Sequence, residues 1–208
     1  MHIAPAEEIL EFWFGDPPSD HQALMAKARR WFQGGEAVDR EIIGRFARTV
    51  HAAVKGELDA WSSSPRARLA LVIVLDQFTR NVFRGTPLTY AGDARAQDLA
   101  LRSFTDGTSE QLAFIEQLFL SMPMLHAESL YLQRRVSGIA KRLAARAPEV
   151  YRAMTPMHLE QTAKYLGVIE RFGRFPHRNA LLGRETTPEE LAFLSDWAEK
   201  APPAGMRG

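Results

Sequence analysis

The chain has 208 residues, of which 46% are hydrophobic and 25% charged, so it can bury a substantial core as ordinary globular proteins do. Its 26 basic and 25 acidic residues leave a net charge of +1, which gives no overall field to attract nucleic acid or an anionic membrane. Because the chain has no cysteine, disulfide bonds, thiolate nucleophiles and cysteine-ligated metal centres are excluded.

The first quarter of the chain carries the apolar spacing of three helices. Pro5 suits a first helical turn and precedes a short helix that ends at Gly15. Ser19 or Asp20 can cap a second helix. The third helix is predicted from apolar residues at every fourth position, namely Val38, Ile42, Phe46 and Val50.

A cap residue followed by proline, Ser64-Pro65, marks the next helix start. The segment that follows contains the apolar run from Leu69 to Leu75, which periodicity alone cannot distinguish from a buried strand. We interpret it as a central helix that is apolar on all sides, because the sequence offers no convincing strand to pair with it.

The second half of the chain also predicts helices. Residues 92–105 have helical spacing, and Thr108 with Gln111 resembles a capping box that opens a further helix. Pro123 is expected to end or kink that helix. The range 126–146 then predicts a long helix whose first residue, a histidine, sits at a fresh helix start.

The cap-proline signal recurs at Thr155-Pro156, for a helix that ends at about Phe172, and at Thr187-Pro188, for the last helix. Short loops between such helices predict an all-α fold of about eight to ten antiparallel helices. We expect a single helical domain over residues 1–200 and a flexible tail over 201–208. A strict 34-residue consensus does not recur, so the sequence shows no regular tetratricopeptide array.

The chain contains Arg-Asn-x-apolar-x-Gly twice, at residues 80–85 and 178–183. Each copy follows a carboxylate that has phenylalanine two residues later and arginine four residues later. The spacing allows Asp76 to meet Arg80, and Glu170 to meet Arg174, on one helical face. Since arginine and asparagine are costly to bury unpaired, the doubled motif indicates where a site would be built.

Helix capping explains part of the doubled motif. Asn81 and Asn179 tolerate left-handed backbone and can end helices, while Gly85 and Gly183 can turn the chain. The donors that capping leaves unexplained are Arg84, His177 and Arg178. Arginine forks suit carboxylate or phosphate, so both a structural network between loops and an anion-binding pocket remain open.

Histidines supply the candidate acid–base groups. His126 and Glu128 are two residues apart, which on a helix points them in different directions, so they do not form a metal pair by themselves. A three-ligand metal site would also need His177 and another carboxylate, and local spacing does not support one. We therefore predict no metal and no cofactor. The candidate catalytic residues are His126, His177 and Glu128. His126 or His177 would be the general acid or base, tuned by Asp76, Glu128 or Glu170.

Common catalytic signatures are absent from the sequence. It contains no Gly-x-Ser-x-Gly elbow, no Walker loop and no dinucleotide-binding fingerprint.

His158 falls in the first turn of its predicted helix, where we expect a neutral role at the surface. The start of the chain lacks the regions of a signal peptide, and its apolar runs are too short to span a bilayer, so we expect a cytoplasmic protein without a membrane segment.

Several of these stretches resemble DUF924, a bacterial family of unknown function with a tetratricopeptide-like helical fold. The matching stretches are residues 9–15, 75–87, 118–123 and 171–185. The resemblance implies an all-α fold and no established activity. Thr79 stands where the family usually has proline, and Tyr165 and Gly167 replace a histidine and an aspartate. Tyr165 can still support a site as a hydrogen-bonding group, but not as a base near neutral pH.

Three functions remain open from the sequence. The first is a polar pocket that binds, and could also process, a small anionic molecule. The residues expected to bind that anion are Arg80, Asn81, Arg84, Arg174, Arg178 and Asn179. The second is a non-catalytic module that holds a protein or peptide partner on a concave helical surface. In the third, the motifs only lock helix ends together. Convergence of the motif residues on one pocket would favour the first function, a wide groove lined with exposed aromatic residues the second, and separate satisfied pairs the third.

Overall fold

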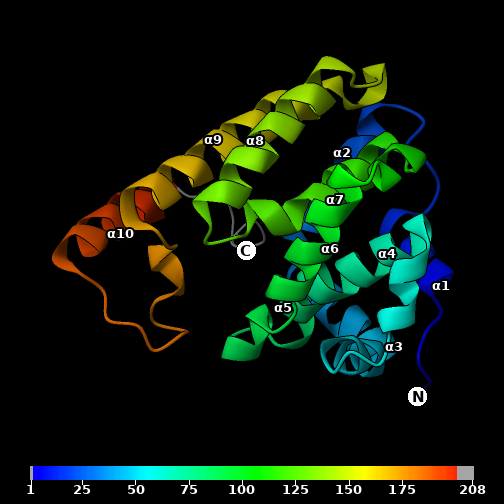
Figure 1. Cartoon of the computed structure of the whole chain (residues 1–208), viewed down its shortest axis with the longest axis horizontal. Helices are drawn as coiled ribbons and strands as arrows, with labels where there is room; N and C mark the ends of the chain where they lie inside the picture. Colours follow the sequence, from blue (N-terminus) through cyan, green and yellow to red (C-terminus); the bar gives the residue numbers. More distant parts are fainter. Residues whose placement is uncertain (1, 201–208) are drawn as a thin grey trace.

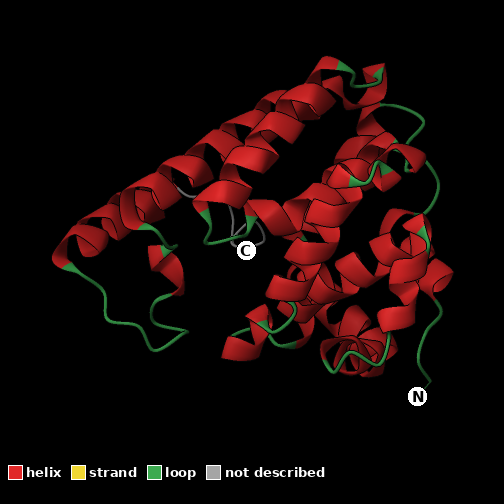
Figure 2. Cartoon of the chain, in the orientation of Figure 1, coloured by secondary structure: helices red, strands yellow, loops and turns green. Residues whose placement is uncertain are grey.

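The computed structural model describes the backbone of residues 2–200 and the side chains of residues 2–197. Within these residues the chain forms helices joined by loops, and no strand occurs (Figure 2). The predicted all-α fold is therefore confirmed, whereas the tetratricopeptide-like arrangement stays a prediction. The tail predicted for residues 201–208 lies outside the described residues. No helix in the described part of the chain is long and apolar enough to cross a membrane.

Ten α-helices occur in the described residues, in agreement with the expected number. They are α1 (Ala6–Phe14), α2 (His21–Gln33), α3 (Gly35–Val54), α4 (Pro65–Val72), α5 (Thr79–Val82), α6 (Asp93–Thr105), α7 (Phe114–Leu125), α8 (Leu130–Ala145), α9 (Thr155–Phe172) and α10 (Pro188–Lys200). Short 3-10 turns lie between several of them, including Pro87–Tyr90, Thr108–Gln111 and Pro176–Arg178.

The helices pack around two groups of buried side chains. Helices α1 to α7 gather on one side of the molecule, and α8 and α9 run beside each other as a long pair that carries α10 at its outer end (Figure 1). The first core centres on the fully buried rings of Phe46, Phe78 and Phe119. The second fills the space under α8 and α9. Phe104 and Phe114 contact both cores, so the two parts are joined by continuous apolar packing.

The apolar run from Leu69 to Leu75 is a buried helix, as predicted, but it changes geometry part-way. After α4, residues Ile73–Phe78 form a π-helical turn that continues directly into α5. There the Thr79 N–H bonds to the Val74 carbonyl, five residues back. The Thr79 hydroxyl takes the place of the displaced donor and bonds to the Leu75 carbonyl at 2.8 Å. Such π turns occur mostly in single turns at functional sites, and this one carries Asp76.

Gly92 allows the start of α6 to pack directly against this π-helical turn. A Cβ atom at Gly92 would lie 2.2 Å from the Leu75 carbonyl oxygen, far inside van der Waals contact. We expect Gly92→Ala to lower the free energy of unfolding by about 2–3 kcal/mol, because the backbone at Leu75 cannot move without disturbing the core. Urea denaturation measures this change.

Gly44 in α3 provides the matched control for that measurement. It is exposed, and a Cβ atom there would have no neighbour within 4 Å. Gly44→Ala should therefore stabilise the protein by up to about 1 kcal/mol, since alanine favours helix more than glycine does. Equal effects of the two substitutions would contradict the close approach at Gly92.

Two predicted helix starts are wrong. The segment Thr108–Gln111 is a 3-10 turn, and α7 begins only after it, where the Glu116 carboxylate accepts the Ala113 N–H at 2.9 Å. Pro123 is accommodated in the last turns of α7 without ending it. His126 is consequently the residue that ends α7, and α8 begins after Ser129, whose hydroxyl accepts the Leu132 N–H.

Candidate functional site

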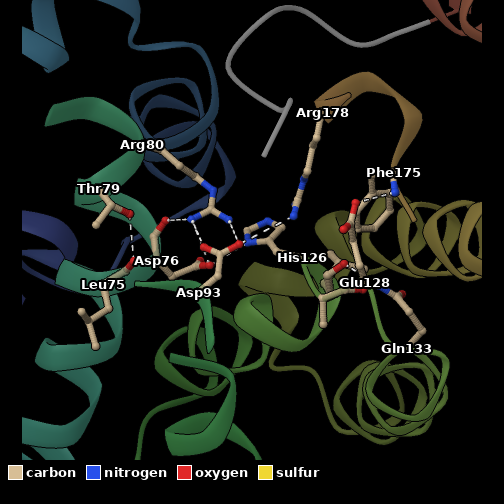
Figure 3. Close-up of polar contacts among 12 residues, drawn as sticks. Leu75, Asp76, Thr79, Arg80, Asp93, His126, Glu128, Gln133, Phe175 and Arg178 are labelled. Atoms are coloured by element: carbon tan, nitrogen blue, oxygen red, sulfur yellow. Dashed lines mark hydrogen bonds and ion pairs between the residues drawn. The ribbon is translucent and has the colours of Figure 1, made fainter. Parts of the chain in front are cut away.

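A group of charged side chains lies inside the fold, and we call it the Asp76 cluster. Its members are Asp76, Arg80, Asp93, His126 and Arg178. None of these side chains is more than 12% exposed. They come from five separate elements, namely the π-helical turn, α5, the start of α6, the end of α7 and the 3-10 turn after α9 (Figure 3). Tertiary folding therefore assembles the cluster from distant parts of the sequence.

Asp76 and His126 form a buried hydrogen-bonded pair. The imidazole Nδ1 lies 2.8 Å from one carboxylate oxygen of Asp76, and the Gln77 amide donates to the other oxygen. Burial acts to raise the pKa of Asp76, but Arg80 and His126 outweigh it and hold the pKa at about 2. The carboxylate is thus ionised near neutral pH. It fixes the ring through Nδ1 and leaves Nε2 for a further partner.

Arg80 lies between two carboxylates. Its guanidinium is 3.3 Å from Asp76 and 3.1 Å from Asp93, and it also donates to the Asp76 carbonyl. Arg178 approaches Asp93 from another side at 3.6 Å (Figure 3). Burial raises the pKa of Asp93, Arg80 partly opposes this, and the charge of Asp76 adds to the increase. The two carboxylates therefore differ, with Asp76 the stronger acid.

Arg178 is the least satisfied cation of the cluster. Its side chain is only 4% exposed, and its guanidinium stacks over the rings of Tyr90 and Phe175 at 4.5 and 4.7 Å. Its Nε and Nη2 atoms are buried without a hydrogen-bond partner among the described residues, as is Nε of Arg80. Burial lowers the pKa of Arg178, although arginine stays protonated in proteins. Unpaired buried donors are costly, so these atoms reduce the stability that the cluster provides.

A pocket adjoins the Asp76 cluster. It has a cavity volume of about 90 Å³ and lies among α2, the start of α3, α5, α7 and the start of α9. The charged and imidazole side chains that line it are Arg30, Arg80, Arg84, His126 and His158. No aspartate or glutamate lines it among the residues that the structure describes. Each of the lining arginines instead forms an ion pair with a carboxylate that does not line the pocket. Arg30, for example, pairs with Glu41 at 3.0 Å.

Comparison with known proteins places the chain in a family. A family model described as a bacterial protein of unknown function, DUF924, matches residues 9–197. The chain belongs to the DUF924 family. The chain is 34% identical to a protein of unknown function from Agrobacterium tumefaciens, ATU0120, whose solved structure matches with a TM-score of 0.75. That match covers 92% of this chain and 97% of the other. Curated proteins gave no match.

The first motif copy of this DUF924 chain contributes to the pocket. Asn81 and Arg84 both line it, and both bond to Asp39 of α3, at 2.7 and 2.6 Å. The expectation that Asn81 caps a helix end in left-handed conformation is wrong, because only glycines have positive φ among the described residues. Asn81 lies within α5, whereas Gly85 turns the chain with φ of 77°, as predicted.

The second motif copy is mainly structural. The expected pairing of Glu170 with Arg174 is wrong, since α9 ends at Phe172 and Gly173, with φ of 68°, carries Arg174 off the helical face. Arg174 instead bonds to both carboxylate oxygens of Glu190, at 2.7 and 2.9 Å. Asn179 donates to the same carboxylate, and its predicted left-handed conformation is wrong because its φ is −56°. Only Arg178 of this copy enters the Asp76 cluster.

The structure separates the two other candidate catalytic residues from His126. The carboxylate of Glu128 accepts two bonds from Arg184, at 2.7 and 2.9 Å, and the Phe175 N–H at 2.7 Å. These contacts hold the loop after α9 and lower the pKa of Glu128 against the effect of burial. The ring of His177 stacks against Trp197, with ring centres 6.1 Å apart. Glu170 lies half-exposed beside Arg134 at 3.5 Å.

Tyr165 lies close to the cluster, near enough to interact electrostatically with Arg178 and Arg80, and its supporting role stays a prediction. Its side chain is buried and packs against Phe175, with ring centres 5.1 Å apart, and it hydrogen-bonds to Gln161, which lines the pocket. Burial raises the pKa of Tyr165, so the phenol keeps its proton near neutral pH. It can position other groups but cannot serve as a base there.

Sequence reasoning missed several members of the site. Asp93 and Asp39 carry no local signal, because an aspartate at a helix start or on a helix face is ordinary. His158, expected to be neutral and at the surface, is half-buried: its Nε2 atom is buried without a hydrogen-bond partner among the described residues, and the residue lines the pocket. Burial lowers the pKa of His158 to about 4. No group of three or more metal-ligating side chains occurs in the described part of the chain.

Proposed function

We propose that this DUF924 protein binds a small anion in the pocket and places it against His126, which Asp76 orients for proton transfer. The lining of the pocket carries this proposal. Three arginines and two histidines line it, and none of its described lining residues is a carboxylate. Hydrogen-bond donors that surround a cavity, while the carboxylates paired with them lie outside it, favour a ligand that is negatively charged and accepts hydrogen bonds.

The arginines are well suited to recognise an oxyanion. A guanidinium has five N–H donors, so a fork that bonds a carboxylate on one side keeps donors for a ligand on the other. Arg84 uses Nε and Nη2 for Asp39, which holds the side chain at the pocket wall. Arg178 does not line the pocket, but it adds a second buried positive charge near Arg80. Carboxylate and phosphate share the required chemistry.

The acid–base role is proposed for His126 alone of the three candidates. Its Nδ1 is engaged by an ionised carboxylate, and its ring lines the pocket, which is the arrangement of a base with its orienting group. The oxygens of Glu128 are occupied by Arg184 and the Phe175 N–H. A protein or peptide partner has no comparable observation behind it, and it stays a prediction from the sequence, as does a cytoplasmic location.

Titration with inorganic phosphate tests the proposal. We expect phosphate to raise the melting temperature in a saturable manner, because a ligand bound only by the folded state stabilises it by about 2.7 kcal/mol at a hundred times its dissociation constant. Acetate should act in the same direction. Sodium chloride at equal ionic strength is the control for screening. The ring resonances of His126 should shift during the phosphate titration.

Two results decide the test: a saturable rise of the melting temperature and a shift of the His126 ring resonances. If neither phosphate nor acetate raises the melting temperature more than sodium chloride does, the pocket does not bind anions of this kind. If an anion binds without moving the His126 resonances, the binding role stands and the proton-transfer role fails.

A further inference from the structure

The junction of α2 and α3 places free backbone donors at the pocket. Gly34 and Gly35 both line it, at the end of α2 and the start of α3. The N–H groups of Gly34, Gly35 and Glu36 have no acceptor among the described residues, and no side chain caps α3. Free N–H groups at the start of a helix this long carry partial positive charge and favour an anion.

The backbone conformation turns these donors to one side. Gly34 has a right-handed φ of −63°, whereas Gly35 has a φ of 55°, and this alternation forms a concave group of N–H donors known as a nest. A Cβ atom at Gly34 would lie 2.6 Å from the Arg30 carbonyl oxygen, so glycine is needed there. At Gly35 a Cβ atom would have no neighbour within 4 Å, and the backbone is therefore open to a ligand.

Two arginines of the pocket are held beside the nest. Arg84 bonds to Asp39 at 2.6 Å and Arg30 pairs with Glu41 at 3.0 Å, and both carboxylates lie near the start of α3. Arg30 also precedes Gly34 by four residues, so the two lie on one face at the end of α2. Backbone and side-chain donors thus adjoin one space, which the paired carboxylates do not line.

His126 gives an independent sign that a ligand belongs in this space. The residue is 7% exposed, and Asp76 engages its Nδ1 atom. Its Nε2 atom has no hydrogen-bond partner among the described residues, but unlike Nε2 of His158 it is not cut off from accessible space. Because His126 lines the pocket, a ligand there can reach Nε2.

We infer that the anion is a phosphate group, bound as a dianion between the nest at the start of α3 and the side chains of Arg84 and His126. This inference rests on the proposed function for the anionic character of the ligand. A phosphate group has at least three strong acceptor oxygens that point in different directions, whereas a carboxylate has two in one plane. Phosphate can therefore accept bonds from the nest and from the arginines at once. The neutral amides of Gln77, Asn81 and Gln161, which also line the pocket, add no preference for either charge.

Glu36→Pro removes one donor of the nest, and Glu36→Ala is its matched control. Both variants lose a carboxylate that is 91% exposed, but only proline lacks the N–H. Proline is tolerated in the first turn of a helix, and the preceding glycine has no Cβ to clash with the ring. In calorimetric titration we expect Glu36→Pro to bind inorganic phosphate about 10- to 100-fold more weakly than Glu36→Ala, since a charge-assisted hydrogen bond contributes on that scale.

The choice of anion tests the ligand class in the wild type. Inorganic phosphate should bind at least about tenfold more tightly than acetate, because it accepts more of the available donors. Methyl phosphate, titrated in parallel, distinguishes the source of the group. Binding that equals or exceeds that of inorganic phosphate indicates an organic phosphate monoester as the natural ligand, and binding of inorganic phosphate alone indicates free phosphate. Both results support a phosphate site.

Amide resonances of the wild type cover the case in which Glu36→Pro does not fold. Inorganic phosphate should move the amide proton resonances of Gly35 and Glu36 downfield, and sodium chloride should not. Equal affinities for phosphate and acetate, equal phosphate binding by Glu36→Pro and Glu36→Ala, or unmoved amide resonances overturn the inference and leave the proposed function standing. If the wild type binds neither phosphate nor acetate, the proposed function itself fails.

Discussion

Asp76→Asn is expected to lower the free energy of unfolding by about 3–5 kcal/mol, which is the usual cost of removing one partner from a buried ion pair. Asparagine keeps the shape of the side chain but not its charge. Of its two carboxylate partners Arg80 would keep only Asp93, whose pKa is raised, and His126 would lose the carboxylate that fixes its ring. Chemical denaturation followed by circular dichroism measures the loss.

Asp98→Asn is the matched control. Asp98 also pairs with an arginine four residues later, Arg102, at 2.9 Å, but the pair lies on the surface with side chains 51% and 69% exposed. Its removal should cost less than about 1 kcal/mol. Similar losses in the two variants would show that the burial of Asp76 does not strengthen its interactions.

The pH dependence of the same variant gives a second readout. The pKa of Asp76 is about 2 in the folded protein, below its ordinary value of 3.8. A group with a lowered pKa stabilises the fold above its unfolded pKa and loses that contribution as the pH falls toward the folded value. Asp76 should therefore contribute about 2 kcal/mol that disappears between roughly pH 4 and pH 2. The stability of Asp76→Asn should change less over that interval.

Much of the fold was predictable because its signals are local. Cap residues followed by proline located the starts of α4, α9 and α10, and apolar spacing located the core faces of the other helices. The expected pairing of Glu170 with Arg174 was wrong because a spacing of four residues brings two side chains together only where the helix continues through both of them. Gly173 ends α9 between them and sends the arginine to Glu190.

The site was predictable only for residues with an unusual local context. The doubled motif and the position of His126 shortly after Pro123 directed attention to Arg80, Arg84, Arg178 and His126, and the structure places Arg80, Arg178 and His126 in one cluster. Asp93 and His158 could not be found in the same way. Their positions in the site depend on burial and on packing against other helices, which no sequence spacing encodes. Asp93, for example, follows Gly92, whose close packing on Leu75 brings the start of α6 to the cluster.

Arg84→Met is expected to weaken phosphate binding by roughly 10- to 100-fold, because a charge-assisted hydrogen bond contributes about 1.5–3 kcal/mol. The same change should cost little stability. Arg84 is 51% exposed, and Asn81 continues to donate to Asp39 after the substitution. Calorimetric titration with phosphate, together with urea denaturation, separates the two effects. Arg84→Lys should lie between wild type and methionine, since lysine keeps the charge but not the fork.

Arg134→Met is the control that makes the comparison specific. Arg134 is 65% exposed and pairs with Glu170 at 3.5 Å, so it matches Arg84 in residue type and in having a carboxylate partner, but it does not line the pocket. It should leave phosphate binding unchanged. Equal loss in both variants would mean that phosphate responds to the overall charge of the surface. A loss confined to Arg84 would connect the first motif copy to ligand recognition and leave the second copy, apart from Arg178, with the structural role that its bonds to Glu190 support.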